Sequence, residues 1–104
     1  MATDKGYRDF ILDQLSGTGG LSCRPMMGEY ILYVDGKIVG GIYDDRLLVK
    51  PTASARRLMP DAPTELPYEG AKEMLLVDSV DDRAFLRELF AAVAAELPAP
   101  KKKV

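Results

Sequence analysis

The sequence contains no histidine and only one cysteine, and both scarcities narrow the chemistry open to it. Histidine is the usual general base near neutral pH and the commonest metal ligand. Ser-His-Asp and Cys-His catalysis, zinc-histidine sites and Cys-x-x-Cys motifs are therefore excluded. Two acidic pairs remain, but Asp44-Asp45 suits a turn and Asp81-Asp82 a helix start. We expect no enzyme, no metal site and no cofactor.

Long apolar stretches are also missing. No run approaches the ~20 apolar residues that cross a bilayer, and no apolar signal region follows the N-terminus. Cys23 has no partner for an internal disulfide. Although Cys23 stands beside Arg24, its place in an expected strand favours a small structural cysteine over a reactive thiol. These features predict a soluble, cytoplasmic protein with no membrane partner.

Basic residues are too few for a nucleic-acid surface. Fourteen lysines and arginines oppose sixteen aspartates and glutamates, for a formal net charge of −2. Without Lys101, Lys102 and Lys103, eleven basic side chains oppose the same sixteen acidic ones. Because neutralising phosphates requires a basic excess, direct nucleic-acid binding is not expected.

What is present is enough for one globular core. The chain has 104 residues, the size of one ordinary domain, and 47% of them are hydrophobic. We place a single domain at residues 1–97 and a disordered tail at 98–104. A first helix should begin near Thr3 or Asp4, with one packed side formed by Tyr7, Phe10, Ile11 and Leu15.

The rest of the chain alternates between strand and helix patterns. Four strands of an antiparallel meander are expected at about 22–27, 29–34, 37–43 and 46–50. A short helix at 53–59, a proline-containing loop at 60–72, a strand at 74–77 and a helix at about 80–97 follow. Ser79 in a capping box with Asp82, or Asp81 with a hydrophobic staple, should start the last helix.

These patterns together predict the fold class. It is an α+β two-layer sandwich, in which a four-strand meander and one later strand form an antiparallel sheet with helices packed on one face. The element order is α-β(3-4)-α-β(1-2)-α.

The two predicted hairpin turns decide which side chains share a face of the sheet. We assume two-residue loops at Asp35-Gly36 and Asp44-Asp45 and regular pairing of the strands on either side of each loop. The resulting sheet has two apolar faces. We assign one face to the core beneath the long helices: Ile31, Tyr33, Ile38, Ile42, Leu47 and Val49. Gly40 on this face would allow a helix to approach closely.

The second face is too apolar for a normal solvated side of an antiparallel sheet. It would collect Tyr30, Leu32, Val34, Val39, Tyr43 and Leu48, edged by Lys37, Arg46 and Lys50. We expect this face, with Arg46 and Lys50, to bind a protein partner, most simply a second copy in a homodimer.

Two alternatives for the second face stay open. In the first, the loop at 60–72 or the short helix covers part of it. A further possibility is a small anionic ligand held in a concave pocket by Tyr30, Tyr43, Arg46 and Lys50.

Several segments resemble one known family. They are Arg24–Tyr33 (RPMMGEYILY), Asp35-Gly36-Lys37, Asp44–Lys50 (DDRLLVK) and Pro67-Tyr68-Glu69-Gly70. Together they are similar to the TfoX N-terminal domain family, over Tyr7 to about Leu97. The resemblance implies a secretion-chaperone-like α+β fold and a regulatory role related to natural competence. It also implies a stand-alone N-terminal domain, without the C-terminal domain of the competence regulators.

Overall fold

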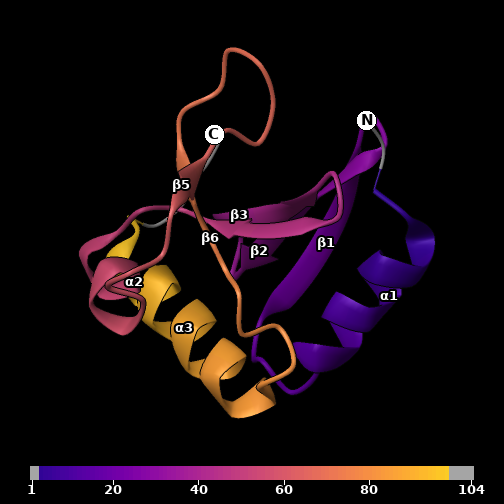
Figure 1. Cartoon of the computed structure of the whole chain (residues 1–104). Helices are drawn as coiled ribbons and strands as arrows, with labels where there is room; N and C mark the ends of the chain where they lie inside the picture. Colours follow the sequence, from indigo (N-terminus) through magenta and orange to yellow (C-terminus); the bar gives the residue numbers. More distant parts are fainter. Residues whose placement is uncertain (1–2, 99–104) are drawn as a thin grey trace, which may run out of the picture.

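The computed structural model describes residues 3–98 and has the predicted α+β architecture. Its three helices are α1 (Lys5–Gln14), α2 (Ala53–Leu58) and α3 (Arg83–Glu96). They lie on one side of the sheet, whereas the loop between β5 and β6 rises on the other side (Figure 1). None of the helices in residues 3–98 is long and apolar enough to cross a membrane. The expected tail, from residue 99 onward, falls outside the described residues.

The sheet is antiparallel and contains six strands in the order β1-β2-β3-β4-β6-β5. The strands are β1 (Leu21–Met26), β2 (Glu29–Val34), β3 (Lys37–Tyr43), β4 (Arg46–Val49), β5 (Thr64–Glu65) and β6 (Met74–Leu76). The four-strand meander and the later strand are confirmed. β5 was not predicted, because its two residues lie in the stretch assigned to a proline-containing loop.

Three tight turns connect the meander, and all place residues in the left-handed region. The predicted turns are confirmed, with φ of 52° at Asp35, 79° at Gly36, 50° at Asp44 and 56° at Asp45. The third turn, Met27-Gly28, has φ of 51° and 86°. Glycine, asparagine and aspartate suit such positions, whereas Met27 does not. Its side chain is 97% exposed, so no packing within the described residues explains it.

A bulge in β3 overturns the predicted pairing of β2 with β3. Val34 pairs with Lys37 and Tyr33 with Ile38, as a regular hairpin requires. Leu32 then pairs with Gly40 instead of Val39, so the register shifts by one residue. Because side chains alternate with a period of two, this shift exchanges the faces of β2 relative to β4.

The core consequently combines three residues of the first predicted face with four of the second. Of the residues assigned to it, Ile42, Leu47 and Val49 are fully buried in the main hydrophobic cluster. Ile31, Tyr33 and Ile38 were assigned there wrongly, because they lie on the opposite face. The main cluster instead takes Tyr30, Leu32, Val34 and Val39, together with Ile11 of α1, Leu15 at the C-cap of α1, and four large residues of α3: Leu86, Leu89, Phe90 and Val93.

Gly40 has a different neighbour from the one predicted. A Cβ atom at this position would lie 2.0 Å from the Leu48 carbonyl oxygen and 2.8 Å from Val49 Cα. These are backbone atoms of β4. The glycine therefore permits close approach between two strands at the bulge, and not the approach of a helix.

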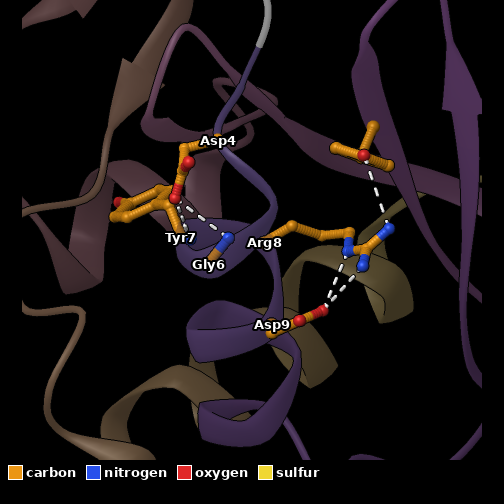
Figure 2. Close-up of polar contacts among 6 residues, drawn as sticks. Asp4, Gly6, Tyr7, Arg8 and Asp9 are labelled. Atoms are coloured by element: carbon orange, nitrogen blue, oxygen red, sulfur yellow. Dashed lines mark hydrogen bonds and ion pairs between the residues drawn. The ribbon is translucent and has the colours of Figure 1, made fainter.

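Side-chain caps fix where α1 and α3 begin. Asp4 caps α1 by accepting hydrogen bonds from the N–H groups of Gly6 and Tyr7 at 2.9 and 3.3 Å (Figure 2). For α3 the cap is Asp82, which accepts from the Phe85 N–H at 3.0 Å, and neither Ser79 nor Asp81 holds that position. Phe10 was also misplaced, since it is 41% exposed on α1.

The short helix α2 is held by the end of α3. The Glu96 carboxylate accepts hydrogen bonds from the N–H groups of Ala53 and Ser54 at 2.9 and 2.7 Å. Hydrogen bonding from the side chain and backbone of Ser54 keeps the pKa of Glu96 below its ordinary value. Thr52 completes the N-terminal cap by accepting from the Ala55 N–H.

Candidate functional site

Four of the eight predicted partner-binding residues are part of the core and cannot contact a partner in the folded chain. Leu32 and Val39 are fully buried, Val34 is 4% exposed and Tyr30 is 9% exposed. The prediction for these four is wrong because it assumed regular pairing across the bulge.

Tyr30 is also engaged by α1. The Arg8 guanidinium lies 5.0 Å from the centre of the Tyr30 ring, and its Nη1 donates to the Tyr30 hydroxyl at 3.4 Å. Arg8 is paired in turn with Asp9 at 2.9 Å, as Figure 2 shows. Tyr30 is therefore not one of the ligand-pocket residues that the alternative prediction grouped around Tyr43 and Lys50.

Tyr43 and Leu48 do lie on the face opposite the long helices, but they are covered. Together with Met74 they form a second, smaller buried cluster. The β5–β6 loop closes over this cluster, with Pro67 buried and the Tyr68 ring centre 6.1 Å from that of Tyr43. Burial raises the pKa of Tyr43, and the neighbouring Tyr68 adds to the effect. The alternative in which the loop covers part of this face is thus confirmed.

Arg46 anchors the covering loop and is not a free rim cation. Its Nη1 forms an ion pair with Glu65 at 2.5 Å. Its Nη2 donates to the Leu66 carbonyl at 3.2 Å, and its Nε donates to the Tyr43 carbonyl at 3.1 Å. These contacts tie the start of the β5–β6 loop to the β3–β4 turn.

The uncovered part of this face lies over β1, β2 and β3. We call it the outer patch and define it as Arg24, Ile31, Tyr33 and Ile38. Ile31 and Tyr33 are half-buried, Ile38 is 39% exposed, and the Arg24 guanidinium lies 5.8 Å from the Tyr33 ring centre. The three apolar members were predicted to lie in the core. The Gly40-Gly41 pair inside β3 was the signal for the bulge that turns them outward.

Lys50 lies at the edge of a hollow beside the outer patch, as a rim residue should. The hollow has a volume of about 530 Å³ and lies between the β5–β6 loop, the sheet and the end of α3. Tyr43 and Lys50 both line it, whereas Tyr30 and Arg46 do not. The structure therefore brings together two of the four residues proposed for an anionic ligand.

The cysteine and the two acidic pairs, which are the candidate catalytic groups, lie where they serve structural roles. Burial raises the pKa of the Cys23 thiol, although the nearby Arg8 opposes this effect. A raised pKa disfavours the thiolate, which is the nucleophilic form. Of the acidic pairs, Asp45 accepts from the Asp4 N–H at 2.8 Å and Asp82 caps α3. Within residues 3–98, no three His, Cys, Asp or Glu side chains form a cluster suited to a metal.

Comparisons with known proteins agree with the sequence resemblance. An uncharacterised 12.7 kDa protein in the trpE 5′ region of Spirochaeta aurantia is 40% identical over 104 residues, covering 99% of this chain and 90% of the relative. No solved structure matches the chain significantly. The family model of the TfoX N-terminal domain matches residues 13–95. The chain therefore belongs to the TfoX N-terminal domain family.

Proposed function

We propose that this chain is a non-enzymatic regulatory domain that acts by protein interaction, and that it self-associates through the outer patch. Membership of the TfoX N-terminal domain family supports the regulatory, competence-regulator-like role. The observation that carries the interaction is the absence of cover over Ile31, Tyr33 and Ile38 within residues 3–98.

The patch is unlike an ordinary solvated sheet face. Antiparallel strands with one wet side normally place polar side chains there, but β2 and β3 present isoleucine, tyrosine and isoleucine. The neighbouring β4–β6 half of the same face is partly covered by the chain's own loop. The outer patch is the remaining part, and a partner would complete the cover that the loop begins.

A second copy fits this patch by charge as well as by apolarity. In a face-to-face dimer with a two-fold axis parallel to the strands and centred on β2, β1 of one copy lies opposite β3 of the other and beside the other copy's β5–β6 loop. Arg24 is exposed on β1, and Glu69 is exposed on the loop. The two-fold would therefore bring opposite charges together twice at the edges of an apolar contact.

The size of the patch predicts a weak dimer. With strands about 4.8 Å apart and ~3.3 Å per residue, three strands of six residues cover roughly 300 Å² per copy. Stable complexes bury about 800 Å² per partner. The association should therefore be reversible and dependent on concentration, which suits a regulatory contact.

Substitution of Ile38 by aspartate tests the proposal. Sedimentation velocity over a hundredfold range of concentration should show a monomer–dimer equilibrium for the original chain. Ile38→Asp should weaken it about tenfold or more, because it places a charge in an apolar contact. Phe10→Asp is the matched control, since Phe10 is 41% exposed but lies on α1, on the other side of the sheet. A chain that stays monomeric throughout, or equal loss in both variants, would contradict self-association through this face.

A further inference from the structure

The hollow beneath the β5–β6 loop has an apolar floor. Ile38 and Tyr43 line it from β3, Met74 from β6 and Leu97 from the end of α3. Its volume of about 530 Å³ is within the ~300–1,000 Å³ typical of small-molecule sites. A protein side chain would fill only part of such a space.

Two tyrosine rings shape the hollow. The ring centres of Tyr43 and Tyr68 lie 6.1 Å apart at an interplanar angle of 53°, a tilted arrangement at a separation typical of aromatic pairs. The Tyr43 ring can lie against the sheet because residue 41 is glycine. A Cβ atom there would approach the ring to 2.5 Å. Tyr68 is 54% exposed and Tyr43 only 5%, so Tyr68 supplies most of the aromatic surface on which a flat apolar group can pack.

Two cations line the same hollow without partners. Lys50 comes from the end of β4 and Lys72 from the loop. Within residues 3–98 the ion pairs are Arg8–Asp9, Arg46–Glu65 and Arg83–Asp13, so neither lysine has a carboxylate within ion-pair distance. Glu73, the acidic residue among those that line the hollow, accepts a hydrogen bond from the Thr64 hydroxyl at 2.9 Å.

We propose that this hollow binds a small aromatic carboxylate, whose ring packs against the exposed Tyr68 ring, over the floor formed by Tyr43 and Met74, while its carboxylate meets Lys50 and Lys72. Apolar contact supplies the burial, and the two ammonium groups select for negative charge. Partial exclusion of water by the loop strengthens that charge selection, since Coulomb attraction increases as the effective dielectric constant falls.

The test compares two probes of the same shape. 2-Naphthoate and its neutral analogue 2-naphthamide are titrated into the chain, and the signals of the Met74 methyl group and the Tyr43 ring are followed by NMR. We expect saturable shifts at both residues with 2-naphthoate. Binding of 2-naphthamide should be about tenfold weaker, because its neutral amide can accept a hydrogen bond from a lysine but cannot form an ion pair with it.

Substitutions of the two lysines then test whether these side chains are responsible for the preference for a negatively charged ligand. Lys50→Gln and Lys72→Gln should each weaken 2-naphthoate binding several-fold and leave 2-naphthamide binding unchanged. Lys5→Gln is the matched control, because Lys5 is an exposed lysine on α1 and does not line the hollow. Unfolding temperatures of all three variants should match the original chain, since these side chains are on the surface.

Three results would overturn this proposal: equal affinity for the two probes, shifts confined to residues outside the hollow, or no saturation. Because Ile38 belongs to both the outer patch and the hollow, the titrations are made at a concentration at which sedimentation shows only the monomer. If the original chain binds 2-naphthoate but does not dimerise, only the proposed function is rejected. If it dimerises but does not bind 2-naphthoate, only the ligand site is rejected.

Discussion

Leu32→Asp should leave the chain unfolded at room temperature. Leu32 is fully buried between the sheet and the helices, so the substitution removes a large apolar side chain and buries an unpaired carboxylate. The combined cost should be about 5 kcal/mol or more, comparable with the entire stability of ~5–15 kcal/mol of a small domain. Circular dichroism and urea titration would measure it.

The neighbouring residue provides the matched control. Tyr33 follows Leu32 on the same strand, but it lies on the outer patch and is half-buried. Tyr33→Asp should therefore retain a cooperative unfolding transition and lose about 1 kcal/mol, the usual cost at a partly exposed position. A folded Leu32→Asp protein, or an unfolded Tyr33→Asp protein, would mean that the two faces are assigned the wrong way round.

Gly40→Ala should be nearly as disruptive, although it adds a single methyl group. The new Cβ atom would lie 2.0 Å from the Leu48 carbonyl oxygen. The obstacle is the backbone of β4, so no side-chain rotation can relieve the overlap and the two central strands must separate. We expect a loss of roughly 3 kcal/mol in the free energy of unfolding, the upper range for overpacking. Urea unfolding of the variant provides the value.

Gly19→Ala is the control for any general effect of replacing glycine. A Cβ atom at residue 19 has no neighbour within 4 Å, and its backbone does not need the left-handed region. This variant should be neutral or more stable by up to about 1 kcal/mol, because alanine restricts the unfolded chain. Equal destabilisation by both substitutions would show that close approach at the bulge is not the cause.

Local signals in the sequence predicted most of the elements. The turns at Asp35-Gly36 and Asp44-Asp45 set the ends of β3, and that strand was predicted with its observed bounds of Lys37–Tyr43. Leu86, Leu89, Phe90 and Val93 recur at helical spacing and are buried on one side of α3. Such signals depend on residues a few positions apart, so they can be recognised without knowledge of the tertiary structure.

The faces of the sheet were only half predictable. β4 was assigned correctly relative to the second half of β3, because the pairing there is regular. The single extra residue at Val39 then exchanged the two faces of β2 relative to the prediction. Gly40-Gly41 was the available signal, but glycine in a strand is compatible with a bulge and with close packing alike. Sequence spacing alone does not distinguish the two.

The cover over Tyr43 and Leu48 depended on contacts between distant residues. Arg46 reaches Glu65 and Leu66, which are 19 and 20 positions away. The stretch of residues 60–72 looked like an unstructured surface loop because of its prolines. Its packing on the sheet follows from the Arg46 contacts and from the Tyr43–Tyr68 pair, neither of which has a local pattern.

The most direct test of the account is the solvent accessibility of methyl groups on the two faces of β2 and β3. A soluble gadolinium chelate, added to the dilute chain, increases the NMR relaxation of protons near the surface. We predict strong enhancement for the Ile31 and Ile38 methyl groups and little for Leu32 and Val39, which are fully buried. Enhancement at Leu32 and Val39 with protection of Ile31 and Ile38 would contradict the outer patch as the open face.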